Sequence, residues 1–110
     1  MSKRGSAELI SDIKESITRI SVYINGMSYE KFIKDIKTQD AVVRNLEIIG
    51  EAVKGLSADF KKKHSKIPWK DLAGLRDRLI HHYFGVNFDI VWKVAKDELR
   101  EILPLLKNLP

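Results

Sequence analysis

Residues 41–54, AVVRNLEIIGEAVK, show the clearest helical periodicity in the chain. Residues three or four apart share one face of an α-helix, so such a stretch buries that face against neighbouring elements. The pattern predicts an amphipathic helix over residues 39–54, which Gly55 closes. The apolar side chains that form its buried stripe are Val42, Val43, Leu46, Ile49 and Val53.

Helical spacing and cap residues continue on both sides of this stretch. An apolar stripe predicts a first helix over residues 6–24, and Asn25–Gly26 ends it because glycine tolerates a left-handed backbone. Ser28 is a suitable N-cap for a short second helix. Residues 57–64 form a short basic connector with one or two helical turns.

Two more main helices are predicted in the second half of the chain. Pro68 suits the first position of a helix that ends near Phe84–Gly85. Asn87 caps the last helix, and Pro104 limits its length. Four main helices with short connections, plus one or two short ones, predict an all-α up-and-down bundle that forms a single domain over residues 1–110.

The composition bounds the class of protein. A chain of 110 residues with 44% hydrophobic and 32% charged residues can form one small globular domain. The absence of cysteine excludes a disulfide scaffold, thiolate zinc sites and a cysteine nucleophile, and it fits a cytoplasmic location. No apolar run approaches about 18 residues, and no apolar segment follows the basic N-terminus, so we expect neither a membrane span nor a secretory signal.

Positive charge is concentrated in the second half of the chain. The formal net charge of +5 makes nucleic acid a plausible partner. In the connector, only Asp59 opposes the lysine cluster made up of Lys61, Lys62, Lys63, Lys66 and Lys70. Two interpretations fit this cluster: a solvated face, which is the common case, or a contact surface for RNA.

The densest polar cluster is RDRLIHHY, residues 76–83. Imidazole takes and gives protons near neutral pH, and guanidinium presents a planar charged fork that fits phosphate. Together they suit phosphodiester cleavage without a metal, with a histidine taking the proton of a ribose 2′-OH and an arginine stabilising charge on the phosphate.

Helix geometry both supports and limits this interpretation. Arg76 and Tyr83 are seven positions apart, so the two share a face of a helix, and Asp77 can orient His81 at i, i+4. Arg76 and His81, five residues apart, are separated by about 140° around an ideal helix. The alternative is a solvated helix in which Asp77 pairs with His81 and Arg78 lies near His82.

The spacing of Arg76, His81 and Tyr83 resembles the R-x4-H-x-Y motif of the HepT branch of HEPN toxins. Residues 41–54 resemble the second helix of that family. Residues 67–99, IPWKDLAGLRDRLIHHYFGVNFDIVWKVAKDEL, resemble its motif helix, the following turn and its last helix. The resemblance covers residues 5–106.

This resemblance implies a metal-independent endoribonuclease that acts as a toxin of a type VII-like toxin–antitoxin pair and needs no cofactor. Arg76 and His81 would be the catalytic pair, and Asp77 would support them where the family more often has Asn. It also implies a homodimer in which two motif helices line one cleft. RNA contacts are expected at the four lysines from Lys61 to Lys66, at Arg44 and at Arg78.

The resemblance also implies a partner, a MntA-type nucleotidyltransferase antitoxin that transfers AMP from ATP to Tyr83. AMP would add bulk and negative charge where an RNA phosphate must lie. Alternatively, Tyr83 only packs at the end of the helix. A different class of function also remains open, in which the chain is a non-catalytic helical subunit that positions the substrate of a nucleotidyltransferase.

Other conspicuous residues have structural interpretations. Arg44 and Glu51 either face the cleft, with Glu51 pairing a motif arginine, or belong to a polar surface. Gly50 inside a helix indicates a close helix–helix approach. Trp69 and Trp92 have core spacing. His64 has no metal-ligand spacing around it, so we predict no metal site.

Overall fold

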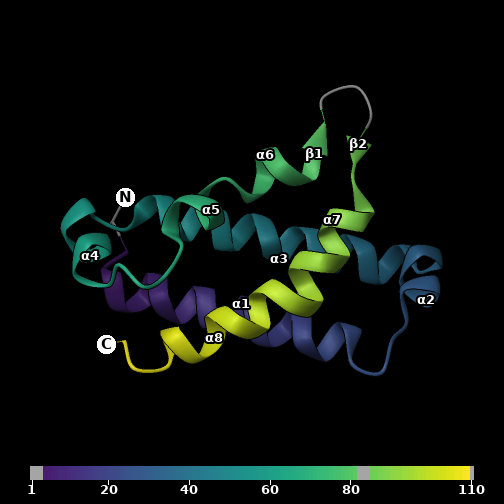
Figure 1. The fold of residues 1–110 in the computed structure, drawn as a ribbon, viewed down its shortest axis with the longest axis horizontal. Coiled ribbons are helices and arrows are strands. Elements are labelled where there is room, and N and C mark those ends of the chain that lie inside the picture. The colour runs from purple at the N-terminus through teal and green to yellow at the C-terminus, as the bar shows by residue number, and fades with distance from the viewer. Residues whose placement is uncertain (1–3, 82–84, 110) are drawn as a thin grey trace.

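The computed structural model describes residues 4–81 and 85–109, and for Ile80 and His81 it describes the backbone. Two long helices, α1 (Ser6–Ile24) and α3 (Ile36–Gly55), lie side by side and run in opposite directions (Figure 1). A short helix α2 (Tyr29–Lys34) links them at one end, and α4 (Ala58–Lys63) follows at the other end.

The predicted apolar stripes form the core of this helix pair. Ile13, Ile17 and Ile20 of α1 face Val42, Leu46, Ile49 and Val53 of α3, and each of these side chains is at most 1% exposed. The other helices pack around this pair, which confirms an all-α domain with one hydrophobic core.

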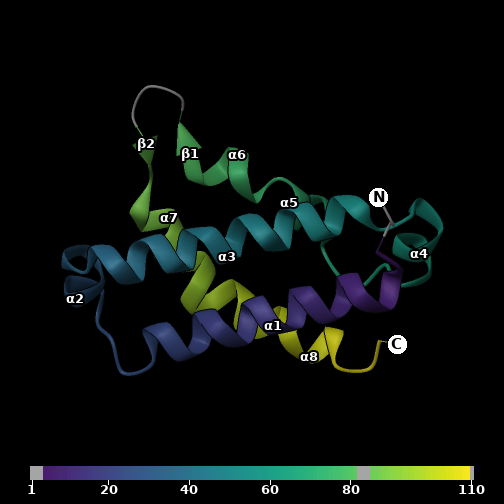
Figure 2. The same cartoon turned by 180° about the vertical axis from the view of Figure 1, so that it is seen from behind.

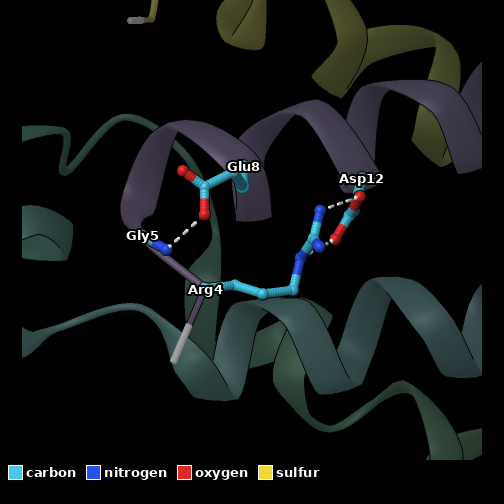
Figure 3. A network of polar contacts seen from close by, with 4 residues as sticks. All are labelled: Arg4, Gly5, Glu8 and Asp12. Carbon is cyan, nitrogen blue, oxygen red and sulfur yellow. Dashed lines mark hydrogen bonds and ion pairs between the residues drawn. The ribbon is translucent and has the colours of Figure 1, made fainter. Parts of the chain in front are cut away.

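Local cap signals set the helix starts. The Ser28 hydroxyl accepts a hydrogen bond from the backbone N–H of Lys31, as predicted. At the start of α1, the Glu8 carboxylate accepts from the N–H of Gly5 at 2.8 Å (Figure 3). The predicted start of α3 at residue 39 is wrong: the carboxylate of Asp35 accepts from the N–H of Thr38 at 3.0 Å, so the helix begins at Ile36.

The last helical segment is one continuous run with a π-helical turn inside it. It consists of α7 (Phe88–Lys93), the π turn η1 (Val94–Glu98) and α8 (Leu99–Leu106). Asn87 caps it as predicted, accepting from the N–H groups of Asp89 and Ile90. The predicted stop at Pro104 is wrong, because the helix continues to the fully buried Leu106, whose packing holds the chain helical beyond the proline.

The predicted fourth helix is also wrong in its extent. Two short helices, α5 (Trp69–Ala73) and α6 (Leu75–Leu79), are separated by Gly74. The chain then forms a two-residue strand β1 (Ile80–His81) that pairs antiparallel with β2 (Gly85–Val86). This hairpin stands out from the helices in both views (Figures 1 and 2). Gly85 permits the return because its φ of 75° is in the left-handed region.

Gly50 lets α5 approach α3 closely, as predicted. A Cβ atom at Gly50 would lie 3.4 Å from the backbone carbonyl oxygen of Leu72. The backbone of α5 therefore lies directly on α3, and the segment that follows α5 is positioned by this contact.

In the part of the chain that the structure describes, no helix combines the length and the apolar character that crossing a membrane requires.

Candidate active site

The motif residues project from α6 because of how this helix is anchored. Leu75 and Leu79, four residues apart, are each 1% exposed and hold one face of α6 on the core. The three residues between Leu75 and Leu79, Arg76, Asp77 and Arg78, are all exposed. Within the described part of the chain, Arg76 and Asp77 take part in no ion pair, so both charged groups are available to solvent.

The hairpin fixes the backbone at His81. The Cα partners in the ladder are His81 with Gly85 and Ile80 with Val86. The N–H of Asn87 donates to the carbonyl oxygen of Leu79 at 2.7 Å, which closes the base of the hairpin. The two chain segments on either side of the loop are therefore held together by the backbone.

This arrangement replaces the predicted helical geometry of the motif. Because α6 ends at Leu79, Asp77 and His81 are not related as i and i+4 on a helix, and the 140° separation of Arg76 from His81 does not apply. The side chain of His81, and all of His82, Tyr83 and Phe84, lie outside the described residues.

Arg78, a predicted RNA contact, is engaged by a carboxylate. Its two terminal nitrogens lie 3.1 and 3.2 Å from the two carboxylate oxygens of Glu98. The hydrogen bonds to Glu98 raise the pKa of the Arg78 guanidinium. The π turn η1 brings Glu98 to this position, and π turns are frequent at functional sites. Arg78 thus ties α6 to η1.

The other predicted RNA-binding residues lie elsewhere. Lys61, Lys62 and Lys63 form the last turn of α4, and Lys66 follows them. Figures 1 and 2 both show α4 at the end of the molecule that carries the termini, well away from the hairpin. The lysine cluster is therefore not beside the motif, because the chain from α4 to α6 runs back along α3.

The helix α3 contributes charged residues to the surface. Arg44 is exposed there. The Glu51 carboxylate lies 3.8 Å from the Lys54 ammonium group. This i, i+3 pair, and no pair with a motif arginine, is the interaction that Glu51 makes within the described residues.

Contacts that sequence reasoning missed support the base of the hairpin. The Tyr29 hydroxyl donates a hydrogen bond to the Asp89 carboxylate, which joins α2 to the first turn of α7. This hydrogen bond raises the pKa of Tyr29. Phe32 is fully buried, and its ring lies 5.1 Å from that of Trp92. No local signal reveals these contacts, because about 60 residues separate the partners in each pair.

Among the described residues, no group of three or more histidine, aspartate and glutamate side chains is arranged to hold a metal ion. Trp69 is a buried core residue, and its indole N–H donates to the carbonyl oxygens of Lys61 and His64.

The chain is similar to known proteins over most of its length. The profile of the family described as "Ribonuclease HepT-like" matches residues 13–109. A "Probable ribonuclease HepT" of Thermococcus cleftensis is 45% identical over 97 residues, which is 88% of each chain. No solved structure matches.

Two further relatives carry the name "Putative RNase". One, from Methanocaldococcus jannaschii, is 43% identical over 113 aligned positions that span 99% of this chain and 93% of that protein. The other, from Caldanaerobacter subterraneus subsp. tengcongensis, is 51% identical over 86 residues, 78% of this chain and 77% of that protein. With the family match covering most of α1, all of α3 and the motif segment, the chain belongs to the HepT-like ribonuclease family and is by class an endoribonuclease.

Proposed function

We propose that this protein cleaves RNA without a metal, at a site made by Arg76, Asp77 and His81. The observation that carries the proposal is the exposure of Arg76 and Asp77 on α6, immediately before the strand that contains His81. Two leucines fix α6 on the core, so the guanidinium is presented by a supported element.

In the proposed reaction, the nucleophile is the ribose 2′-OH of the RNA itself. His81 takes the 2′ proton as general base, and the 2′ oxygen attacks the adjacent phosphorus. The bond from phosphorus to the 5′ oxygen breaks, and that oxygen takes a proton from solvent as it leaves. The products are a 2′,3′-cyclic phosphate and a 5′-hydroxyl end.

Arg76 and Asp77 have separate roles in this scheme. The Arg76 guanidinium stabilises the negative charge that builds on the phosphoryl oxygens in the transition state. Asp77 is assigned the role of supporting His81 on the family resemblance, since the two are not i and i+4 on one helix. Its negative charge also repels an incoming phosphate, so the neutral Asp77→Asn variant tests how these two effects balance.

The biological role that we propose is that of a cytoplasmic toxin of a type VII-like toxin–antitoxin pair. A MntA-type nucleotidyltransferase would neutralise it by transferring AMP to Tyr83: the phenolic oxygen attacks the α-phosphorus of ATP, the proton is lost to solvent and pyrophosphate leaves. Tyr83 follows His81 by two residues. An AMP group at this point would occupy the space that an RNA phosphate needs.

We further propose a homodimer, in which the hairpins of two copies line one cleft. The hairpin stands clear of its own helices, which supports this arrangement (Figure 1). Two copies of Arg76 and His81 would then face one RNA strand.

The decisive experiment incubates the protein with RNA in EDTA and compares wild type with His81→Ala and Arg76→Ala. We expect wild type to cut under chelation, Arg76→Ala to lose about 10²–10³-fold in rate, and His81→Ala to be inactive. The matched control is His82→Ala, which removes the adjacent histidine and keeps activity. Cutting that stops in EDTA would overturn the metal-independent mechanism.

Expression in a host cell separates the toxin from the non-catalytic helper. A toxin arrests growth, and His81→Ala relieves the arrest. A harmless wild type that His81→Ala does not change would favour the helper subunit. Incubation with a nucleotidyltransferase partner and ATP should add one or more AMP masses to wild type and none to Tyr83→Phe.

A further inference from the structure

A positively charged hollow lies between the end of α1 and the segment η1–α8. Its volume is about 540 Å³, within the range of small-ligand sites. Lys96, Arg100 and Lys107 line it on one side, and Ser21 and Asn25 line it on the other. None of the residues that line it, all of which are described, is Asp or Glu.

The run η1–α8, with the residue that follows it, supplies all three cations of the hollow. Lys96 in η1, Arg100 in α8 and Lys107 just after α8 all line the hollow, so the run presents these three cations to it. The three acidic residues of the same stretch do not line the hollow: Glu98 pairs with Arg78, and Asp97 and Glu101 are exposed outside it. The positive charge of the hollow is therefore not neutralised by the run that supplies it.

An aromatic residue supports one of the cations. The Lys96 ammonium lies 5.2 Å from the centroid of the Trp92 ring, which is half-buried and lines the same hollow. Such a cation–π contact restrains the ammonium group at the wall of the hollow.

A second basic hollow adjoins the first. Its volume is about 340 Å³, and Lys63, His64, Lys66 and Asn108 contribute to its lining. Pro104 lines both hollows, so they meet at this residue of α8. The two hollows together form a basic track across α8. Lys63 and Lys66, from the cluster predicted to contact RNA, line one part of it, and Lys96, Arg100 and Lys107 line the other.

We propose that a single strand of RNA lies across α8 along these two hollows, with its phosphates paired to Lys96, Arg100 and Lys107. A single nucleotide would fill only one of the two hollows. An RNA strand has linked phosphates and can occupy both, because the hollows share Pro104. A free nucleotide would present the same chemistry, and the experiment below distinguishes the two. The inference rests on the proposed ribonuclease function and extends it.

The track is an exosite, remote from the cleavage chemistry. Both views show α8 and the hairpin on opposite sides of α3 (Figures 1 and 2). RNA bound at α8 would reach the hairpin only by passing around the molecule, or by entering the hairpin of another copy. The track would therefore favour long substrates over short ones.

The test uses the inactive His81→Ala background and fluorescence anisotropy with a single-stranded RNA of about ten nucleotides, a length typical of single-strand grooves. The variant is Lys96→Gln/Arg100→Gln/Lys107→Gln. The matched control is Arg19→Gln/Lys54→Gln/Lys93→Gln, which removes the same charge from exposed positions on α1, α3 and α7 that line neither hollow. Circular dichroism confirms that both variants fold.

Loss of three phosphate contacts has a calculable signature. For single strands, each contact contributes about 0.7 to the slope of log K against log salt, so the slope should fall by about 2 and the affinity by roughly 10²-fold near 0.1 M salt. The control should keep both slope and affinity. Equal losses in the two variants, or a mononucleotide that binds as tightly as the oligonucleotide, would overturn the exosite.

A cleavage assay separates this proposal from the proposed function. In the active background, the Lys96, Arg100 and Lys107 variant should cut a dinucleotide at the wild-type rate and cut long RNA more slowly. If wild type cuts no RNA yet shows the binding difference, the catalytic proposal fails and the exosite stands. If wild type cuts RNA and the variant cuts long RNA equally well, the exosite fails alone.

Discussion

The α1–α3 pair and the segment from α5 to β2 differ in how they hold their shape. Each long helix buries an apolar stripe, from Ile10 to Ile20 in α1 and from Val42 to Val53 in α3. The segment from α5 to β2 is held at separate points, by Trp69, Leu72, Leu75 and Leu79 and by backbone pairing, and it exposes three charged residues in succession. The pair therefore supplies a continuous part of the core, whereas the segment also presents charged groups to solvent.

This difference explains why the motif is not on a long helix. A continuous helix would bury every third or fourth residue and would space the remaining groups around its circumference. The break at Gly74 and the hairpin after Leu79 release the motif from that periodicity. The α3 scaffold still positions it, because α5 lies on Gly50.

Leu46→Ala should have the largest effect on stability, since this side chain is fully buried at the centre of α3. We expect a loss of about 2–5 kcal/mol from the free energy of unfolding, measured by urea titration. Arg76→Ala, on the exposed side of α6, should change stability by less than about 0.5 kcal/mol while it lowers the cleavage rate. Equal losses of stability in Leu46→Ala and Arg76→Ala would contradict the proposed difference between the two regions.

Gly50→Val should weaken the contact that joins the regions. The first added carbon meets the Leu72 carbonyl oxygen at 3.4 Å, and the two branching methyl groups must displace α5. We expect a loss of about 1–3 kcal/mol together with reduced cleavage.

Gly50→Ala is the control for this change, because its Cβ makes an ordinary contact and alanine is the better helix former. Its stability should be unchanged or greater by up to about 1 kcal/mol. If Gly50→Val still cleaves RNA at the wild-type rate, the position of α5 on α3 does not determine the position of the motif residues.

The sequence was sufficient where the determinants are local. The stripes of α1 and α3 and the caps at Ser28 and Asn87 depend on neighbours within a few residues, and each prediction is confirmed. The close approach at Gly50 is confirmed as well, since a glycine inside a helix costs stability that a closely packed neighbour offsets.

The sequence was insufficient where distant contacts decide the structure. An apolar run through Leu79 and Ile80 continues the helical pattern, yet pairing with Gly85–Val86 ends the helix. Pro104 was expected to stop a helix that the burial of Leu106 extends. The roles of the motif residues were inferred from side-chain chemistry, helix spacing and family resemblance, and they stay predictions.

Glu98→Gln should test whether the link from α6 to η1 matters more for chemistry than for stability. The Arg78 and Glu98 side chains are 40% and 33% exposed, so solvent screens their attraction and the loss should stay below about 1 kcal/mol. A freed Arg78 would change the affinity for RNA, measured as KM separately from kcat. Arg19→Gln, which breaks the exposed pair with Glu15, is the control and should leave both constants unchanged.

The smallest effect is expected at the start of α3, where the N-cap residue Asp35 titrates. The hydrogen bond from the Thr38 N–H to Asp35 lowers the pKa of this carboxyl in the folded state. A lowered pKa contributes stability above the unfolded value, near 3.9, and that contribution is lost as the pH falls through the folded value. The midpoint temperature of thermal unfolding should therefore fall more steeply below about pH 4 for wild type than for Asp35→Asn. Asparagine caps the helix without titrating. Parallel profiles for the two proteins would mean that the cap does not stabilise α3, and the scaffold would then depend on its buried stripe alone.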